Sequence, residues 1–124
     1  MSCEIQVFCE INPSEDPSKV KTAVLNIFPD LKISISDELL IGKSNDIGTL
    51  SNISESIHTK NTKNTYQRIL KKNSNENSTW FYLNKQAAFV SMVALCNESD
   101  ESPLGPIKVV LEANDIEKLI QSLT

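Results

Sequence analysis

Hydrophobic and polar side chains alternate one by one at the start of the chain, over residues 3–11. A period of two residues predicts a strand with one buried face and one face open to water. Asp16 and Pro17 then have the character of a helix N-cap and a first helical position. Apolar residues at helical spacing follow them, and Pro29 ends that pattern. The chain is therefore expected to begin with a strand followed by a helix.

The same two periodicities divide the remainder of the chain. Short apolar or alternating runs predict strands at 31–35, 39–41, 79–83, 88–95 and 107–112. Apolar stripes with steps of three or four residues predict helices at 46–58, 60–72 and 114–123. The resulting order is β-α-β-β-α-α-β-β-β-α. Because hairpin-length connections predominate, we expect a single α+β domain over residues 1–124, a mostly antiparallel sheet with helices packed on one face.

The composition is that of an ordinary globular domain, with 40% hydrophobic and 23% charged residues. A formal net charge of −4 argues against a surface that is basic throughout, but it allows a local basic face. We expect no signal peptide, because the chain leads directly into a strand pattern with charged residues. No apolar run approaches the roughly 18 residues of a membrane helix. Cys3 and Cys9 would lie about 20 Å apart on one strand, too far for a disulfide, so with Cys96 they are predicted to be reduced thiols of a cytoplasmic protein.

The residue patterns of common active sites are missing from the sequence. His58 is the only histidine, and no cysteine stands at a metal-ligand spacing from it, so we expect it at a helix end or on the surface. Gly42, Lys43 and Ser44 match the last residues of a phosphate-binding P-loop, but Asp37 stands where that loop needs its first glycine. The sequence therefore predicts no enzyme, no metal and no cofactor.

A basic segment is the first candidate for a binding surface. Residues 56–75 contain no acid and hold five of the twelve basic residues, namely Lys60, Lys63, Arg68, Lys71 and Lys72. If 60–72 is a helix, several of these cations fall on the side opposite its apolar residues. Such a face would suit an RNA backbone, because each neutralised phosphate releases counterions. A helix face that is merely solvated is the alternative.

The polar trio Asn84, Lys85 and Gln86 is the second candidate, because it interrupts an otherwise apolar pattern. Amide and ammonium groups hydrogen-bond base edges, 2′-hydroxyls and phosphates. The same three residues would also suit an ordinary hairpin turn.

Aromatic residues provide a third candidate surface, made of Phe8, Trp80 and Tyr82. If the sheet has a face turned away from the helices, one of these rings could stack on a base. Otherwise the rings would form a second buried layer or a dimer contact.

The segments Phe81–Val90 and Pro103–Ile107 also carry a resemblance to a known family. Cys3–Pro17 and Asn26–Asp30 fit it as well, so the resemblance covers nearly the whole chain. The sequence resembles a family of small archaeal proteins of uncharacterised function that are often described as RNA-binding. That family is similar in fold to the ribosomal large-subunit protein that binds 5S ribosomal RNA. The resemblance thus implies a ribosomal-protein-like α+β domain with RNA as its leading partner.

Two functions remain open from the sequence. The first is a non-enzymatic RNA-binding domain, in which the five cations of the basic segment and Lys85 contact phosphates while Asn84 and Gln86 hydrogen-bond the RNA. The second is a protein-interaction or self-associating module, such as a homodimer, that binds no nucleic acid. Strand 79–83, which is apolar on both faces, motivates this second function. An enzyme or small-molecule binder would instead need a deep pocket lined by the polar trio.

Overall fold

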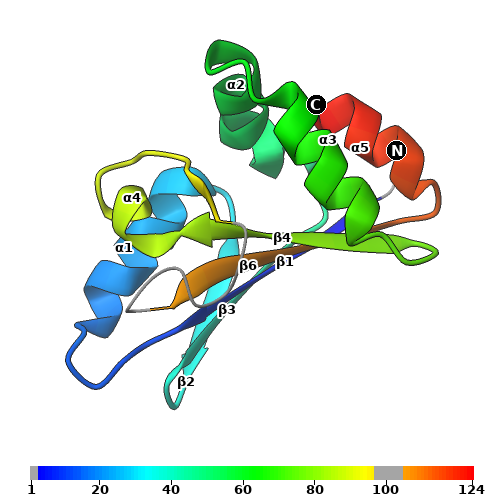
Figure 1. The fold of residues 1–124 in the computed structure, drawn as a ribbon. Coiled ribbons are helices and arrows are strands. Elements are labelled where there is room, and N and C mark those ends of the chain that lie inside the picture. The colour runs from blue at the N-terminus through cyan, green and yellow to red at the C-terminus, as the bar shows by residue number, and fades with distance from the viewer. Residues whose placement is uncertain (1–2, 97–104) are drawn as a thin grey trace.

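The computed structural model describes residues 3–96 and 105–124, and these form a six-stranded sheet covered by helices (Figure 1). Residues 97–102, where the acidic sequence predicts a loop, and the Pro103-Leu104 part of the family resemblance lie outside the described residues. The strands are β1 (Cys3–Glu10), β2 (Lys32–Ser36), β3 (Leu39–Ser44), β4 (Ser78–Asn84), β5 (Leu95–Cys96) and β6 (Pro106–Ala113). Their order in the sheet is β2-β3-β1-β6-β4-β5, and every pairing is antiparallel.

The helices lie on one side of this sheet, above it in Figure 1. They are α1 (Pro17–Ile27), the 3-10 turn η1 (Ile47–Leu50), α2 (Ser51–Thr59), α3 (Lys63–Lys72), α4 (Lys85–Phe89) and α5 (Ile116–Leu123). In the described part of the chain, no helix covers the opposite face, which we call the open face of the sheet. The sheet therefore has a buried face under the helices and a face that side chains alone cover.

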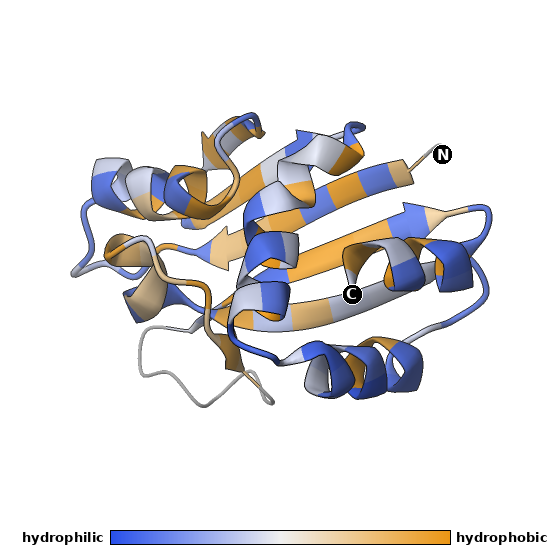
Figure 2. Cartoon of the chain, turned by 90° about the horizontal axis from the view of Figure 1, so that it is seen from above, coloured by the Kyte–Doolittle hydropathy of each residue, from blue (hydrophilic) through white to orange (hydrophobic). Residues whose placement is uncertain are grey.

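The core lies between the sheet and the helices. Every second residue of β1, β4 and β6 is buried there, and Figure 2 shows the corresponding alternation of hydrophobic and hydrophilic residues along the strand that leads from the N-terminus. Tyr66 of α3 meets Phe81 of β4 edge to face, with ring centroids 5.9 Å apart. This packing supplies the hydrophobic free energy that holds α3 against the sheet.

The α+β class, the antiparallel sheet and the predicted order of elements are confirmed, with α4 as an additional short helix. The turn expected at 84–86 and the long return strand expected at 88–95 are wrong. Asn84 ends β4 and caps α4, its side-chain oxygen accepting a hydrogen bond of 2.9 Å from the backbone N–H of Ala87. After α4 the chain reverses direction at Ser91, whose φ is 60°. The returning strand β5 therefore spans only Leu95–Cys96. A side-chain cap followed by good helix formers thus overrides the apolar strand pattern.

Candidate nucleic-acid interface

The basic segment forms the outer face of α3 and the end of α2. Tyr66 and Leu70 of α3 are buried, which turns the rest of the helix toward solvent. The exposed cations are those predicted from the sequence, Lys60, Lys63, Arg68, Lys71 and Lys72, and we call them the α3 basic face. His58 is exposed in the last turn of α2, as predicted. All five cations of the basic segment are therefore exposed, as a phosphate contact requires.

Side-chain hydrogen bonds fix the position of α3. The buried hydroxyl of Thr79 donates to the carbonyl oxygen of Leu70 at 2.6 Å, and the side-chain amide of Asn73 donates to the carbonyl oxygen of Trp80 at 2.9 Å. The side chain of Gln67 donates to Thr124 Oγ1 at 3.1 Å, which joins α3 to the end of α5. The Thr79 bond satisfies a carbonyl in the last turn of α3, and the Thr79 and Asn73 bonds together attach the helix to β4. The cations consequently stand on a fixed support.

Lys60 differs from the other cations of this face. Its ammonium group donates a hydrogen bond of 3.0 Å to the carbonyl oxygen of Val93, in the segment between α4 and β5. Because this lysine remains exposed, the contact leaves part of its ammonium group open to solvent.

The polar trio lies on a different helix from the α3 basic face, and its three side chains have different environments. Gln86 is exposed on α4, whereas Asn84 is the N-cap described above. The side chain of Lys85 is 0% exposed, and its ammonium group donates to the carbonyl oxygen of Glu10 at 2.7 Å and to Glu15 Oε1 at 3.0 Å. A phosphate contact requires an accessible ammonium group, so the structure places Lys85 in a different role from the predicted one. It ties α4 to the loop between β1 and α1.

Glu15 is held as a buried carboxylate in this ion pair. Burial favours a higher pKa for Glu15, but hydrogen bonds from the backbone of Asn12 and from the side chains of Lys85 and Asn12 outweigh it, and the pKa is lowered. Burial raises the pKa of the neighbouring Cys9 thiol to about 11, so this cysteine is protonated at neutral pH. A protonated thiol is a poor nucleophile, and the cluster therefore has a structural character.

The open face of the sheet carries the three aromatic residues predicted as a candidate surface. Phe8 and Tyr82 both pair with Lys108, one from each neighbouring strand, so the lysine stands between the two rings. Trp80 meets Tyr82 edge to face at a centroid distance of 5.1 Å, and the ammonium group of Lys108 lies 5.1 Å from the centre of the Trp80 ring. All four side chains are half-buried, so they do not form a second buried layer in the described structure. We call these four residues the aromatic–lysine patch.

A hollow of about 360 Å³ opens at this patch. Phe8, Tyr82 and Lys108 line it, together with Leu39 of β3 and Pro106 of β6. No local pattern in the sequence marks Lys108 as a member of this site. The alternation of Lys108 with Ile107 and Val109 indicates only which face of β6 the lysine occupies. Which residues lie next to Lys108 depends on the order of the strands in the sheet.

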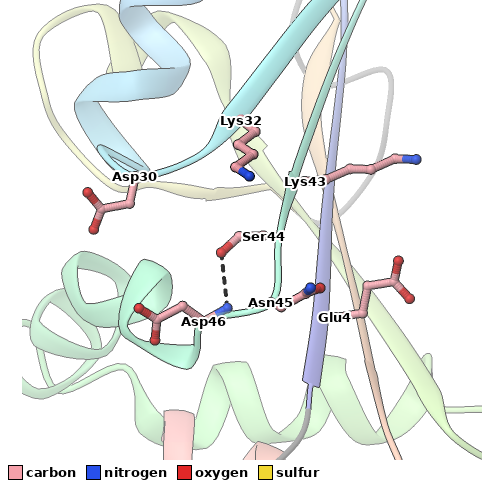
Figure 3. A pocket seen from close by; sticks show the side chains of 7 residues that line it. All are labelled: Glu4, Asp30, Lys32, Lys43, Ser44, Asn45 and Asp46. Atoms are coloured by element: carbon pink, nitrogen blue, oxygen red, sulfur yellow. Dashed lines mark hydrogen bonds between the residues drawn. The ribbon is translucent and has the colours of Figure 1, made fainter.

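A larger surface hollow, of about 610 Å³, lies near the opposite edge of the sheet (Figure 3). Its lining combines carboxylates and lysines: Glu4, Asp30, Lys32, Lys43, Ser44, Asn45 and Asp46. The side chains of Lys32 and Lys43 leave the strands in different directions in Figure 3, and the hydroxyl of Ser44 accepts a hydrogen bond of 3.1 Å from the backbone N–H of Asp46. Lys43 and Ser44 lie within β3 and thus in no phosphate-binding loop. This lining has no arrangement of nucleophile and base.

The described residues hold neither a metal cluster nor a membrane-spanning helix. Within residues 3–96 and 105–124, no group of three or more histidine, cysteine, aspartate or glutamate side chains could hold a metal ion. Across those ranges, no helix is both long and apolar enough to cross a membrane.

Comparison with known proteins gives a consistent family. The profile of a family described as RNA binding matches residues 4–113. A UPF0201 protein of Methanothermobacter thermautotrophicus is 42% identical over 120 residues, which cover 97% of this chain and 89% of that protein. A UPF0201 protein of Sulfurisphaera tokodaii is 35% identical, covering 98% of this chain and 86% of that protein.

Solved structures agree with the sequence comparison. The crystal structure of the UPF0201 protein from Methanococcus jannaschii is 33% identical, covers 97% of this chain and 98% of that one, and superposes with a TM-score of 0.82. An Archaeoglobus protein at 20% identity shares the fold alone, with a TM-score of 0.81. The chain therefore belongs to the archaeal UPF0201 family, whose sequence profile carries the description RNA binding.

Proposed function

We propose that this protein is a non-enzymatic RNA-binding domain of the cytoplasm, and that the RNA backbone runs along the α3 basic face. The observation that carries the proposal is a group of exposed cations on α3 and at the end of α2, in a segment without acids, within a family described as RNA binding. The three cysteines are buried thiols, which fits a reducing compartment. The likeness to the 5S RNA-binding ribosomal protein stays a prediction from the sequence, and it favours a structured RNA.

The net charge of −4 determines how such binding would behave. Long-range attraction of the whole chain to a polyanion is weak, so affinity would come from local contacts between ammonium groups and phosphates. Each contact releases condensed counterions, and the logarithm of the affinity then falls with the logarithm of the salt concentration, by about 0.7 per contact for a single strand. Binding by this face is therefore expected to be strongly dependent on salt.

Gln86 is the member of the polar trio that remains available to RNA, because it is exposed on α4. Asn84 would add a contact only through the part of its amide that the helix cap leaves open. Lys85 has no exposed surface and is not included in the proposed interface.

Fluorescence anisotropy with a labelled RNA hairpin and a labelled single strand, at about 50 and about 200 mM salt, tests the proposal. Lys71→Glu/Lys72→Glu is expected to bind both RNAs more weakly and to reduce the salt slope by about 1.4, from two lost contacts at about 0.7 each. Lys19→Glu/Lys21→Glu on α1 is the matched control, because it changes two exposed lysines and the net charge by the same amount.

Two results would decide against the proposal. Absence of binding to either RNA at low salt would leave the α3 basic face as a solvated helix surface. Equal loss of affinity in the α1 and α3 variants would show that net charge alone governs binding. Lys71→Gln/Lys72→Gln, which adds no negative charge at the C-terminal end of α3, separates lost contacts from a weakened helix.

A further inference from the structure

We infer that the open face of the sheet is a second RNA contact, which stacks unpaired bases on the aromatic–lysine patch. This inference rests on the proposed function and assigns a different surface to a different part of the RNA. Helix α3 contacts β4 from the helix side, whereas Phe8, Trp80, Tyr82 and Lys108 belong to the opposite face. The two surfaces would therefore take phosphates and bases separately.

The register of the sheet aligns the open-face side chains in rows that cross the strands. One row runs Ser34, Ile41, Phe8, Lys108, Tyr82, and the next runs Lys32, Lys43, Gln6, Val110, Trp80. Neither row contains an acidic residue, but acids flank the two rows on both sides. Glu4 and Glu112 form a pair on one side, and Glu10 lies on the other, where it also lines the hollow at the patch. Five strands at a spacing of about 4.8 Å make these rows roughly 19 Å long. The two rows form an acid-free strip with aromatic rings at one end and lysines at the other.

This strip has the components that single-stranded nucleic acids need. Aromatic rings stack on bases without regard to sequence, and lysines beside them meet the phosphates. The hollow between Phe8 and Tyr82, with Lys108 at its side, gives a base a place to enter against a ring. Gln6 and Ser34 add groups that can hydrogen-bond base edges or 2′-hydroxyls.

The lysine end of the strip borders the hollow that Glu4, Asp30 and Asp46 also line, and it adds two cations that phosphates could contact. Lys32 and Lys43 are direct cross-strand neighbours, and neither forms an ion pair with any described residue. Like charges directly opposite each other destabilise a strand pair. Because the two side chains leave the strands in different directions (Figure 3), each ammonium group would meet a phosphate of its own, and each such contact would reduce the repulsion.

A second copy of the chain is the other occupant that such a half-apolar face could take. A dimer over this strip would have to remove Lys32, Lys43 and Lys108 from water. The nearest open-face carboxylates, Glu4, Glu10 and Glu112, lie in the flanking rows and not in the strip itself. Desolvation of unpaired charges is costly, whereas an RNA strand brings its own phosphates. Charge complementarity therefore favours RNA.

The position of Trp80 allows a test on the unaltered protein. Trp80 is the only tryptophan of the chain, so its fluorescence reports on the aromatic–lysine patch. Titration with an unlabelled single-stranded RNA is expected to quench this fluorescence over the same concentration range in which anisotropy reports binding. A duplex of the same sequence, whose bases are already stacked, is expected to quench it far less.

Substitution at the patch gives the quantitative part of the test. Tyr82→Ala and Phe8→Ala are each expected to weaken single-strand binding by about 5- to 150-fold, the range measured for loss of one stacked base. Phe89→Ala is the matched control, since this phenylalanine is 38% exposed on α4, which packs on the helix side. Circular dichroism of each variant verifies that it is folded, and the fluorescence titration needs no variant at all.

The outcomes separate this inference from the proposed function. If no RNA binds, both fail together. If RNA binds in a manner that depends on Lys71 and Lys72, while Trp80 fluorescence and the affinity of Tyr82→Ala stay unchanged, the open-face site is refuted and the α3 basic face stands. A dimer in sedimentation velocity whose dissociation follows Tyr82→Ala, with Trp80 unaffected by RNA, would assign the face to self-association and would also refute the inference.

Discussion

Replacement of Lys85 by methionine is expected to destabilise the fold strongly, even though lysines are rarely structural. The ammonium group of Lys85 is enclosed, and it donates to Glu10 O at 2.7 Å and Glu15 Oε1 at 3.0 Å. The side chain of Glu15 is itself only 7% exposed. Methionine fills a similar volume without a charge, so the variant removes the ion pair and leaves the packing nearly intact.

The magnitude follows from what Lys85→Met leaves behind. Glu15 would keep the two hydrogen bonds of 2.9 Å from the backbone and side chain of Asn12, but its buried negative charge would lose its counter-ion. Removal of one partner from a buried ion pair typically costs about 3–5 kcal/mol. The combined variant Lys85→Met/Glu15→Gln removes the charge as well and keeps an amide oxygen for the Asn12 hydrogen bonds. We expect this combination to recover at least about 1 kcal/mol relative to Lys85→Met, which is a positive coupling in a double-mutant cycle.

Urea unfolding followed by circular dichroism measures these differences in the free energy of unfolding. Lys21→Met on α1 is the control, because Lys21 is exposed and its replacement should change stability by less than about 0.5 kcal/mol. A loss of under about 1 kcal/mol in Lys85→Met would refute the reasoning, since a cost of that size is typical of an exposed pair. A combined variant that is less stable than Lys85→Met would also contradict it.

Two further predictions concern the same core. The pKa of Glu15 is lowered in the folded state, so its ionisation contributes stability that is complete above the unfolded pKa of about 4.5 and is lost as pH falls through the folded pKa. The variant Glu15→Gln should lack this part of the acid dependence when urea unfolding is measured between about pH 6 and 2. Parallel curves of stability against pH for both proteins would contradict the prediction. Gly42→Ala should cost about 1–3 kcal/mol of stability, because a Cβ at Gly42 would lie 2.1 Å from Leu31 Cδ2 inside the core. Thermal unfolding measures this loss against the control Gly48→Ala, where the nearest atom is 3.2 Å from the new Cβ. Equal unfolding midpoints for the two variants would refute the prediction.

Local chemistry explains why some elements could be predicted from the sequence. Asp16 is the N-cap of α1, where its carboxylate accepts from the backbone N–H of Ser18 at 3.0 Å, and Pro17 opens the helix. The alternation over β1 is also a local signal, since each residue has the opposite face from its neighbour. Part of the α3 basic face could be recognised for the same reason, because helical spacing places Arg68, Lys71 and Lys72 away from Tyr66 and Leu70. Lys63 falls nearer the buried side, and Lys60 is the C-cap of α2 and not part of the helix predicted over 60–72.

The role of Lys85 could not be read from the sequence, because its partner Glu15 lies 70 residues away. A lysine in an apolar run suggests either an exposed turn or a buried pair, and only the contact between α4 and the β1–α1 loop distinguishes the two. The short apolar run that follows Lys85 is ambiguous as well, because its periodicity fits a strand and a helix equally. The asparagine at 84 is the one local signal for α4, but the same residue type is equally typical of a turn.

The open face depends even more on long-range order. Phe8 and Tyr82 become neighbours of one lysine because β6, from the end of the chain, inserts between β1 and β4. The alternation within each strand indicates which residues share a face, but the sequence does not give the order of strands. The predicted aromatic surface was therefore correct in its members and lacked Lys108, its central cation.

The two proposed RNA surfaces should differ in their dependence on salt, and this difference separates them within one experiment. Phosphate contacts on the α3 basic face release counterions, so Lys71→Glu/Lys72→Glu should reduce both the affinity and the salt slope. Stacking on an aromatic ring displaces few ions, so Tyr82→Ala should reduce the affinity and leave the slope of the unaltered protein in place. A salt slope that falls equally in both variants would mean that Tyr82 acts through the position of Lys108, whose ammonium group lies at the same patch. Lys108→Gln distinguishes stacking by Tyr82 from a phosphate contact by Lys108. It leaves all three rings in the patch, and loss of one phosphate contact should lower the salt slope by about 0.7.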